Sequence, residues 1–456
     1  MSSPETASSP AAPRPRRGDE LELTVDSLAF GGAGVARLDG YVVFVHDAFP
    51  GDRVRARVQR SKRAYAEARA VELLTPGPDR VAPLADHPGA PWQVLSYDRQ
   101  LEVKSAQVDE ALRRIGHLDG YALAPILPAV APWRYRNKLE YSFGRDESGG
   151  LVCGFHTPGR WDRVESLDDC LLASEPGNVL REQVVAFARE QGLQAHDRRS
   201  GSGFLRNLVV REGRRTGQLQ ARLVTGPGEL DTAALVAAVT CDSLLWTETE
   251  ALAETTTGGR TSLLAGSDAI DEELGGLRFR ISPEAFFQTN TEMAEQLYGI
   301  VGRLAELEGH ERVYDLYCGS GTIALTLATR AAQVWGLEIS EESVADAIFN
   351  ARRNDVDNVR FYAGDVRLAL AELVELASRP DVVVVDPPRS GLSKKVVRRI
   401  IEAAPRRIVY VSCNPTTLAP NAAQLVEAGY RLELVQPVDM FPQTPHIECV
   451  ALLRRE

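Results

Sequence analysis

Four apolar stretches in the C-terminal part of the chain each end in an acidic residue. The stretches are "RVYD", "VWGLE", "VRFYAGD" and "DVVVVD", and the acids are Asp315, Glu338, Asp365 and Asp386. The acids lie 23, 27 and 21 residues apart, about the length of one strand plus one crossover helix. This alternation predicts a parallel, doubly wound α/β sheet, in which ligands bind beyond the carboxyl ends of the strands. The four acids are therefore the first candidates for a binding site.

A glycine-bearing turn follows the first of these strands. In "CGSGTIA", Gly319 and Gly321 stand where a strand turns into a helix, and Glu338 follows at the spacing of a ribose-binding acid. Taken alone, this pattern fits an NAD-dependent oxidoreductase, or a tight strand-to-helix turn with no ligand. Two features favour another cofactor, because Asp315 precedes the loop and a Pro-Pro pair follows Asp386. The layout resembles class I S-adenosylmethionine methyltransferases.

The resemblance implies a role for each part of this edge. The loop from Asp315 to Gly321 would pass the methionine end of S-adenosylmethionine, Glu338 would hold the ribose and Asp365 the adenine. Methyltransferases that act on exocyclic amines have an aromatic residue after Asp-Pro-Pro, whereas "DPPRSG" has Arg389. Amine methylation is therefore the weaker interpretation.

Cys413 ends the next apolar strand, in "IVYVSCNPTTL", and so belongs at the same edge as Asp386. A free cysteine is more often buried filler than a nucleophile. In an irregular segment at a ligand-facing strand end, however, a lowered thiol pKa and substrate access become available. A thiolate that adds to carbon 6 of a pyrimidine makes carbon 5 nucleophilic, and a general base must then remove the proton from carbon 5.

The candidate base lies near the C-terminus, in "HIECVALL". His446 and Glu448 are two residues apart at the start of an apolar strand, so they share one face. An acid that enters such a strand is costly unless it is used or paired. We therefore prefer Glu448 as the base and expect His446 to be packed and hydrogen-bonded.

Five segments together resemble the RNA uracil-5 methyltransferase family, which makes 5-methyluridine in transfer or ribosomal RNA. They are "FFQTN", "DLYCGSGT", "DPPRSGL", "IVYVSCNPTTLA" and "DMFPQTPHIE". The resemblance implies that Cys413 is the nucleophile, that Glu448 is the general base and that Asp386 lies near both cofactor and uracil. The cofactor contacts that we assign on this basis are Gln288, Tyr317, Gly319, Gly321, Glu338, Asp365 and Asp386. We assign Phe286 and Arg389 to the substrate, where Phe286 would stack on a flipped-out base or else pack in the core beside Phe287.

Residues 18–75 read as short strands and turns, which predict a small all-β barrel. "SLAFGGAGVAR" and "VFVHDAFPGDRVRARV" resemble the TRAM domain, an RNA-binding barrel of the oligonucleotide fold. From Arg53 to Arg69, seven basic residues stand against Glu67 alone. This stretch is either an RNA contact or a solvated strand edge that Lys and Arg protect from aggregation. The RNA contacts that we assign are Arg53, Arg55, Arg57, Arg60, Lys62 and Arg63.

The predicted fold class is α/β, with a Rossmann-like class I methyltransferase domain, an N-terminal TRAM-like barrel and a central α+β domain. The predicted parts are a disordered tail (1–17), the barrel (18–75), a linker (76–95), a helix expected to pack on the catalytic domain (96–118), the central domain, assigned to recognition of the RNA substrate (119–280), and the methyltransferase domain (281–456).

Charge and composition exclude several classes of protein. The net charge of −11 argues against RNA binding, but the distribution of charge matters more than the sum. No apolar run is long enough to span a membrane and no secretory signal begins the chain, so we expect a cytoplasmic protein without membrane contact. Six dispersed cysteines without a Cys-x-x-Cys pair argue against disulfides and zinc, and we predict no metal site.

Several ribosomal-RNA members of the family carry an iron-sulfur cluster just before the segment that corresponds to "SYDRQLEVK". Here the preceding "LADHPGAPWQVL" has no cysteine, and only Cys170 resembles the fourth ligand. We therefore predict no cluster.

The sequence predicts an enzyme that transfers a methyl group from S-adenosylmethionine to carbon 5 of a uridine in rRNA or tRNA. A cytosine-5 RNA methyltransferase is an alternative, but its pattern adds a cysteine after proline that "DPPR" lacks. A non-catalytic RNA-binding protein is a second alternative, but the presence of both Cys413 and Glu448 argues against it. RNA is the expected partner, no protein partner is implied, and the oligomeric state is not predicted.

Overall fold

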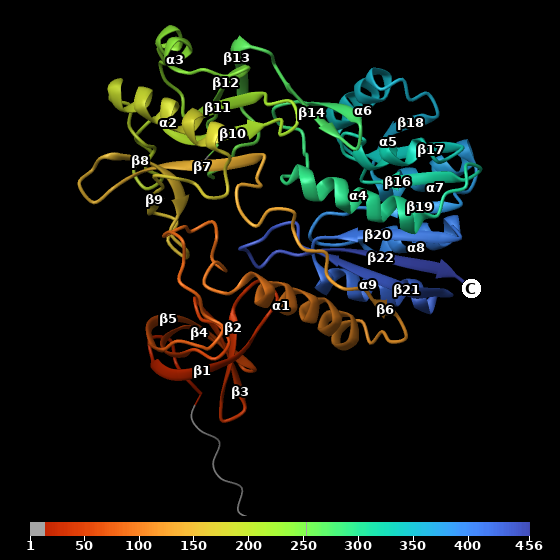
Figure 1. Cartoon of the computed structure of the whole chain (residues 1–456), viewed down its shortest axis with the longest axis horizontal. Coiled ribbons are helices and arrows are strands. Elements are labelled where there is room, and N and C mark those ends of the chain that lie inside the picture. Colours follow the sequence, from red (N-terminus) through yellow and green to blue (C-terminus); the bar gives the residue numbers. More distant parts are fainter. Residues whose placement is uncertain (1–13, 252) are drawn as a thin grey trace, which may run out of the picture. The chain divides into compact units, whose positions relative to one another are not determined.

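The computed structural model describes residues 14–251 and 253–456 (Figure 1). Its contacts divide the chain into two compact units. The first contains the residues up to Ala85, Pro91–Gln107 and Gln443–Pro445, and the second contains Asp86–Ala90, Val108–Pro442 and His446–Glu456. The predicted disordered tail falls mainly on residues 1–13, which lie outside the described residues.

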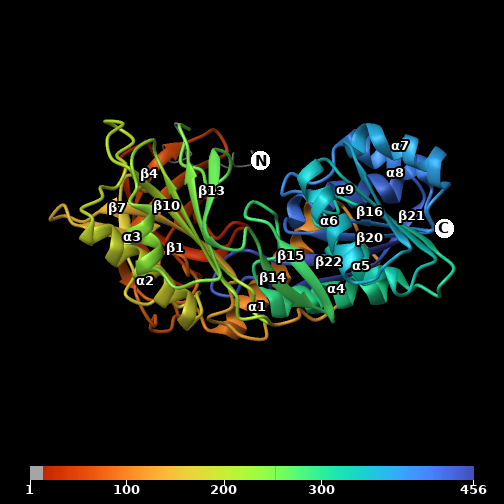
Figure 2. The same ribbon diagram turned by 90° about the horizontal axis from the view of Figure 1, so that it is seen from above.

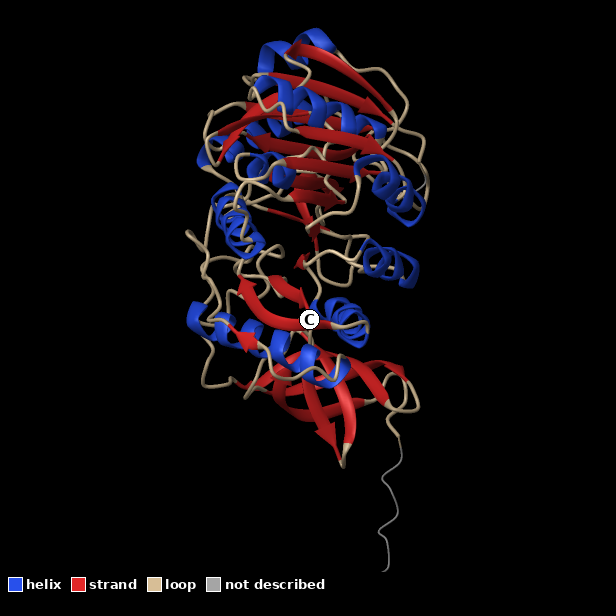
Figure 3. Ribbon diagram, turned by 90° about the vertical axis from the view of Figure 1, so that its right-hand side faces the viewer, coloured by secondary structure: helices blue, strands red, loops and turns tan. Residues whose placement is uncertain are grey.

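Five strands of the first unit close into a barrel in the order β1-β2-β3-β5-β4. Figure 3 draws these strands, like all others, in red. They are β1 (Glu20–Leu28), β2 (Gly34–Leu38), β3 (Tyr41–His46), β4 (Arg53–Ser61) and β5 (Tyr65–Thr75). Alternate residues such as Val54, Ala56 and Val58 are buried in the barrel, as the period of a strand requires. The predicted all-β barrel is confirmed.

Strand β4 is not an edge strand. It pairs antiparallel with β1 on one side and with β5 on the other. A closed barrel has no exposed edge for Lys and Arg to protect. The interpretation of the basic stretch as a guarded strand edge is therefore wrong.

A seven-stranded sheet forms the central part of the second unit, in the order β13-β12-β11-β10-β7-β8-β9. Apolar side chains of one face pack against α2 and α3, whereas the other face carries charged residues such as Lys138, Arg211 and Arg222. The elements are β7 (Lys138–Arg145), β8 (Leu151–His156), β9 (Val164–Ser166), α2 (Glu175–Glu190), β10 (Leu205–Glu212), β11 (Leu219–Thr225), α3 (Thr232–Ala238), β12 (Ser243–Glu248) and β13 (Arg260–Gly266).

An eight-stranded sheet follows, in the order β18-β17-β16-β19-β20-β22-β21-β6. The first five strands are parallel, as predicted. Helices cover both faces, with α4 and α5 on one side and α7 and α8 on the other (Figure 2). The sheet contains β6 (Ala122–Leu123), β16 (Arg312–Leu316), β17 (Gln333–Glu338), β18 (Val359–Ala363), β19 (Val382–Val385), β20 (Arg407–Ser412), β21 (Tyr430–Val438) and β22 (Glu448–Arg455). Its helices are α4 (Thr291–Ala305), α5 (Thr322–Ala328), α6 (Glu341–Arg353), α7 (Val366–Ala377), α8 (Lys394–Ala403) and α9 (Pro415–Glu427).

The sheet differs from the all-parallel prediction at one end. Strand β22 runs antiparallel to both β20 and β21. Strand β6, from the segment that we assigned to the central domain, pairs with the outer side of β21. A separate hairpin, β14 (Ile270–Leu274) and β15 (Leu277–Ile281), precedes α4.

The predicted helix at 96–118 is present as α1 (Tyr97–Glu110) and a π-helical turn, η1 (Ala111–Ile115). Gly116 ends it, where a Cβ atom would meet the Leu112 carbonyl oxygen at 2.8 Å and the Ala419 carbonyl oxygen of α9 at 3.0 Å. A residue without a side chain is needed at this close approach. Among the described residues, no helix combines the length and the apolar character needed to cross a membrane.

Asp52 ties the start of β4 to the segment that follows the barrel. Its fully buried carboxylate accepts hydrogen bonds from the backbone N–H groups of Phe49 (2.7 Å) and Gly77 (2.8 Å). It also accepts two from the Arg80 guanidinium, at 2.7 and 2.8 Å. The same carboxylate therefore accepts all four of these hydrogen bonds.

We predict that Asp52→Ala lowers the free energy of unfolding by about 3–5 kcal/mol, because it leaves a partly buried guanidinium and two N–H groups without their acceptor. Urea unfolding followed by circular dichroism measures the change. Asp26→Ala, at an exposed position of β1, is the control and should change stability by no more than about 0.5 kcal/mol. Equal effects of the two substitutions would contradict this role for Asp52.

Candidate active site

Cys413 and Glu448 meet because two neighbouring strands run in opposite directions. Cys413 follows the last residue of β20, and Glu448 is the first residue of β22. The register places Ser412 opposite Cys449, so the adjoining positions, Cys413 and Glu448, fall at the same edge of the sheet. Cys413 is half-buried and Glu448 is buried. The predicted nucleophile and base are thus brought together.

The acids predicted from the sequence lie along the same edge. Strand order places Asp365 after β18, Glu338 at the end of β17, Asp315 in β16 and Asp386 after β19. Cys413 and Glu448 continue this row on β20 and β22. The backbone N–H of Asp386 donates to the carbonyl oxygen of Leu316 at 3.3 Å, which ties the ends of β19 and β16. One continuous edge therefore carries all six side chains.

The buried carboxyl groups of this row hold their protons strongly. Burial raises the pKa of Asp386 to about 7. Burial, with the nearby charge of Asp386, raises the pKa of Asp315 and of Glu448 well above the usual range, and Arg389 partly opposes the rise at Glu448. Among the described residues, neither carboxylate oxygen of Asp315 has a hydrogen-bond partner. A positively charged ligand would relieve this electrostatic cost.

The Cys413 thiol is not activated by its protein neighbours. Burial raises its pKa to about 11, Glu448 and Asp386 add to the rise, and the Arg389 guanidinium opposes it. The lowered thiol pKa that we considered from sequence is therefore wrong for the protein alone. The physical reason is first the burial of the thiol at this strand end and second the nearby carboxyl groups of Glu448 and Asp386.

The loop after β16 has an unusual backbone. Tyr317, Gly319 and Gly321 have φ values of 65°, 53° and 84°. A Cβ atom on Gly321 would lie 2.8 Å from the Phe361 ring, whereas one on Gly319 would meet nothing within 4 Å. Gly321 thus allows close packing, and Gly319 leaves room beside the loop. The Glu338 carboxylate accepts hydrogen bonds from the N–H groups of Gly319 (3.2 Å) and Ser340 (3.0 Å).

Asp365 already has partners in the protein. It is the N-cap of α7, and its carboxylate accepts hydrogen bonds from the Arg367 backbone N–H at 2.8 Å and from the Arg367 guanidinium. The Arg367 guanidinium, hydrogen-bonded to it, holds the pKa of Asp365 below its usual value. An adenine at this position would meet an ion pair rather than a lone carboxylate.

The loop that carries Phe286 and Gln288 is held by buried residues of the central sheet. Arg211 donates to the Ala285 carbonyl oxygen at 2.9 Å, and Asn137 donates to the Gln288 carbonyl oxygen at 2.8 Å. The Arg222 guanidinium also lies 3.3 Å from the Glu284 carboxylate. Sequence reasoning missed these anchors, because Asn137, Arg211 and Arg222 are far from residues 284–288 in the chain and no local pattern marks them.

Phe286 and Phe287 have opposite environments. Phe287 is buried and lies 6.0 Å from the Phe279 ring, whereas Phe286 is 67% exposed. The alternative in which Phe286 packs in the core is therefore wrong. Arg389 is also exposed, and its guanidinium lies 3.5 Å from Nδ1 of His446. The Asn414 side chain donates to the Arg389 carbonyl oxygen at 3.0 Å, which joins the loops after β19 and β20.

Most of the basic residues predicted to bind RNA have acidic neighbours. Arg53 pairs with Glu22 at 2.7 Å and Arg57 with Glu20 at 2.7 Å. Arg55 pairs with Glu72, and Arg60 lies 3.9 Å from Glu67. Within the described residues, no ion pair engages Lys62 or Arg63. The sequence count included Glu67 but missed Glu20, Glu22 and Glu72, because strand pairing, not sequence distance, makes them neighbours.

Cys170 has a histidine neighbour. Its sulfur lies 3.4 Å from Nε2 of His87. Burial lowers the pKa of His87 to about 4, so its imidazole is neutral at pH 7. Sequence reasoning did not single out His87.

Comparison with known proteins shows the family. Residues 260–456 match the family model described as tRNA (uracil-5-)-methyltransferase, and residues 14–71 match the TRAM domain. The chain is 38% identical to an uncharacterized RNA methyltransferase of Halalkalibacterium halodurans, over 96% of this chain and 97% of that protein. It is 40% identical to one of Gloeobacter violaceus, with the same coverage of both chains. The chain belongs to the RNA (uracil-5-)-methyltransferase family.

A solved member of this family has the same fold. The crystal structure of the Pyrococcus abyssi tRNA (uracil-54, C5)-methyltransferase in complex with S-adenosyl-L-homocysteine matches with a TM-score of 0.78 and 30% identity. The match covers 95% of this chain and 100% of that one. The predicted Rossmann-like class I methyltransferase fold with an N-terminal TRAM barrel is confirmed, and the chain is an RNA methyltransferase by family.

The charges around Cys413 predict how its reactivity changes in the cofactor-free protein. Asp386→Asn removes a negative charge that raises the thiol pKa, so the pKa should fall below about 11 and alkylation by iodoacetamide at pH 9 should become faster. Arg389→Gln removes a positive charge and should have the opposite effect. Mass spectrometry of the Cys413 peptide over a pH series measures both.

Asp365→Asn is the matched control for this experiment, because it removes a carboxylate from the same edge of the sheet but four strands away from Cys413. It should leave the alkylation profile of Cys413 unchanged. Identical profiles for Asp386→Asn and the unmodified protein would contradict the electrostatic account of this thiol.

Proposed function

We propose that this protein transfers a methyl group from S-adenosylmethionine to carbon 5 of a uridine in RNA, through a covalent bond between Cys413 and the uracil. The observation that carries the proposal is the shared edge of the sheet, where a thiol and a buried carboxyl group face each other beside a row of acids. Membership of the RNA (uracil-5-)-methyltransferase family supports the same reaction.

The residues of this edge fit a cationic cofactor. S-adenosylmethionine supplies an electrophilic methyl group on a positively charged sulfonium. The carboxyl groups of Asp315 and Asp386, whose pKa values are raised, favour a positive charge nearby. The space beside Gly319 leaves room for a ligand at the loop. In this proposal Glu338 and Gln288 hold the polar groups of the cofactor. The P. abyssi neighbour was crystallised with the demethylated form of this cofactor.

Each proposed step uses a side chain of this edge. A positive charge beside Asp386 lowers the thiol pKa of Cys413, and the thiolate then adds to carbon 6 of the uracil. The carbon–sulfur bond leaves an enolate that makes carbon 5 nucleophilic. After carbon 5 gains the methyl group, the Glu448 carboxylate takes the proton from carbon 5, and the electron pair expels Cys413 as a thiolate. The raised pKa of Glu448 makes its carboxylate a stronger base than an exposed one.

Transfer RNA is the first substrate to test, because the solved relative acts on uracil 54 of tRNA. Ribosomal RNA is the second. Nucleoside mass spectrometry of each RNA fraction from cells with and without the gene identifies the substrate, since loss of 5-methyluridine from one fraction names it.

The covalent mechanism predicts opposite behaviour of two variants. Glu448→Gln should reduce turnover by roughly 10²- to 10⁴-fold and accumulate a protein–RNA adduct, because the proton on carbon 5 stays in place. Cys413→Ala should methylate nothing and form no adduct, even with RNA that contains 5-fluorouridine. Denaturing electrophoresis with RNA from cells that lack the gene detects the adduct.

Cys241→Ser is the matched control, because Cys241 is a partly exposed thiol just before β12 of the central sheet. Its adduct with 5-fluorouridine RNA should equal that of the unmodified protein. An adduct that persists in Cys413→Ala would rule out this nucleophile.

The ion pairs of the barrel predict which basic residues bind RNA. The double variant Lys62→Gln/Arg63→Gln should weaken RNA binding and reduce the slope of log K against log salt by up to about 1.4, roughly 0.7 for each lost contact with single-stranded RNA. Arg53→Gln/Arg57→Gln removes the same charge from residues already paired with Glu22 and Glu20, and should change the slope less. Equal slopes for both double variants would contradict this distinction.

A further inference from the structure

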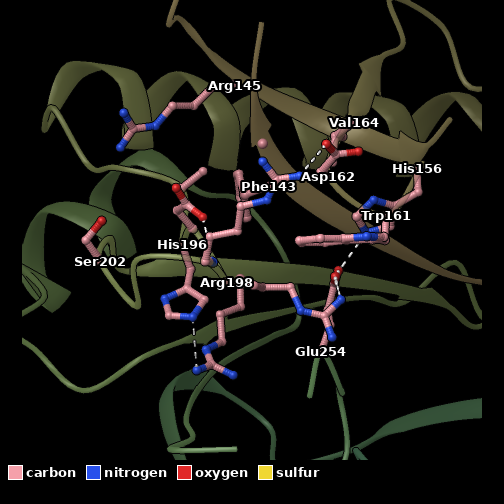
Figure 4. Close-up of a pocket in the computed structure, with 15 residues that line it drawn as sticks. Phe143, Arg145, His156, Trp161, Asp162, Val164, His196, Arg198, Ser202 and Glu254 are labelled. Atoms are coloured by element: carbon pink, nitrogen blue, oxygen red, sulfur yellow. Dashed lines mark hydrogen bonds and ion pairs between the residues drawn. The ribbon is translucent and has the colours of Figure 1, made fainter. Parts of the chain in front are cut away.

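The central sheet carries a pocket that takes no part in the proposed reaction (Figure 4). Its volume is about 280 Å³, close to the lower end of small-molecule sites. Segments from β7 to β9 and from residues 195–206 line it. A neighbouring hollow of about 650 Å³ shares His156, Trp161, Arg198 and Glu254 with it. Every residue of the pocket belongs to the second unit.

An exposed tryptophan stands in the wall of the pocket. Trp161 is 50% exposed, although a large aromatic side chain is usually covered. The guanidinium carbon of Arg198 lies 5.6 Å from its ring centroid, and that of Arg199 lies 5.1 Å away. Aromatic rings beside guanidinium groups are the surface on which proteins hold bases of single-stranded RNA.

Glu254 fixes the polar wall of the pocket. Its carboxylate lies 3.0 Å from Nε2 of His156 and accepts hydrogen bonds from Ser142 and, at 3.0 Å, from Asn207. The Arg198 guanidinium lies 3.7 Å from the same carboxylate. Burial alone would raise the pKa of Glu254, but the hydrogen bonds from His156 and Ser142 lower it to about 2. The carboxylate is thus ionised and fully engaged, and it orients the cationic side chains around it.

The pocket keeps a surplus of positive charge. Asp162 is engaged by Arg160 at 2.9 Å and by Arg199 at 3.0 Å. No carboxylate of residues 14–251 or 253–456 forms an ion pair with Arg145 or Arg206. Arg206 is buried; its terminal nitrogens contact the Ala251 carbonyl oxygen and, at 3.5 Å, Nε2 of His196, whereas its Nε has no hydrogen-bond partner among these residues. A buried guanidinium without a carboxylate favours an anionic ligand.

We propose that this pocket binds one unpaired nucleotide of the RNA substrate, at a position other than the uridine to be methylated. The guanidinium groups of Arg145 and Arg206 hold the phosphate side, and the base lies against Trp161. The inference rests on the proposed function in so far as RNA is the substrate. An unpaired nucleotide fits better than a helix, because the pocket has a volume of only about 280 Å³ and only unstacked bases expose a face to an aromatic side chain.

A binding experiment tests the site without using methyl transfer. Tryptophan emission of the full chain is recorded during titration with a single-stranded RNA 10-mer, and in parallel with inorganic phosphate and poly-glutamate. The 10-mer should quench the emission, and the quenching should be largely lost in Trp161→Phe while Cys413→Ala retains it. Quenching that is undiminished in Trp161→Phe, or that phosphate or poly-glutamate reproduces, would overturn the proposal.

Affinity measurements on two exposed residues give the second test. Trp161→Ala and Arg145→Gln should each weaken binding of the 10-mer, by roughly tenfold for Trp161→Ala. Arg145→Gln should also reduce the salt slope by about 0.7. Arg398→Gln, an exposed arginine on α8, is the charge-matched control and should change neither quantity. Unchanged affinity in both pocket variants would overturn the proposal.

Kinetics separate this inference from the proposed function. With the full RNA substrate, Trp161→Ala should raise KM and leave kcat unchanged, because the pocket holds a nucleotide away from the reacting carbon. If RNA quenches the emission of Trp161 but the protein methylates no RNA fraction, the nucleotide-binding pocket is supported and the proposed methyl transfer is refuted. If Trp161→Ala methylates RNA with the same KM as the unmodified protein, the proposed methyl transfer is supported and the nucleotide-binding pocket is refuted.

Discussion

The antiparallel course of β22 is the constraint on which the active site depends. In an all-parallel sheet the start of a strand lies at the edge opposite to the strand ends, so an acid that opens the last strand would lie far from the other acids. Because β22 returns between β20 and β21, its first residue, Glu448, comes to the edge where Cys413 ends β20. One reversed strand therefore brings the carboxyl group that we propose as the base to the edge formed by the ends of the parallel strands.

This edge is electrostatically costly to the folded protein. A carboxyl group whose pKa is raised on folding favours the fold at low pH and loses that contribution as the pH rises through the raised value. For Asp386 the loss occurs between about pH 4 and about pH 7, and Asp315 and Glu448 add to it. At neutral pH the cost is offset when a cation binds among the acids, since binding to the folded state alone stabilises it. The same charge would lower the thiol pKa, so in the proposed mechanism cofactor binding would activate Cys413.

The sequence could predict the features that depend on residues close together in the chain. The acids and Cys413 end apolar runs, so strand period and the spacing of strand-helix units were enough to place them on one edge. The thiol pKa could not be predicted, because it depends on burial and on Glu448, a residue 35 positions further along the chain. The anchors of the Phe286 loop, Arg211 and Asn137, and the pocket around Trp161 also depend on pairing between distant segments. Sequence patterns revealed the edge but not its surroundings.

Arginine illustrates the same limit, because its role depends on the partner that folding provides. In the barrel, register places Arg57 opposite Glu20 and Arg55 opposite Glu22, and Arg53 also reaches Glu22, so a run that looks strongly basic in sequence is largely neutralised. In the central pocket, Arg145 and Arg206 are scattered in sequence, yet no carboxylate of the described residues pairs with either. A basic residue therefore attracts RNA when no acidic residue of the protein pairs with it. The density of basic residues along the chain does not decide this. The net charge of −11 therefore does not by itself exclude RNA binding, because binding depends on where basic residues without acidic partners gather on the surface.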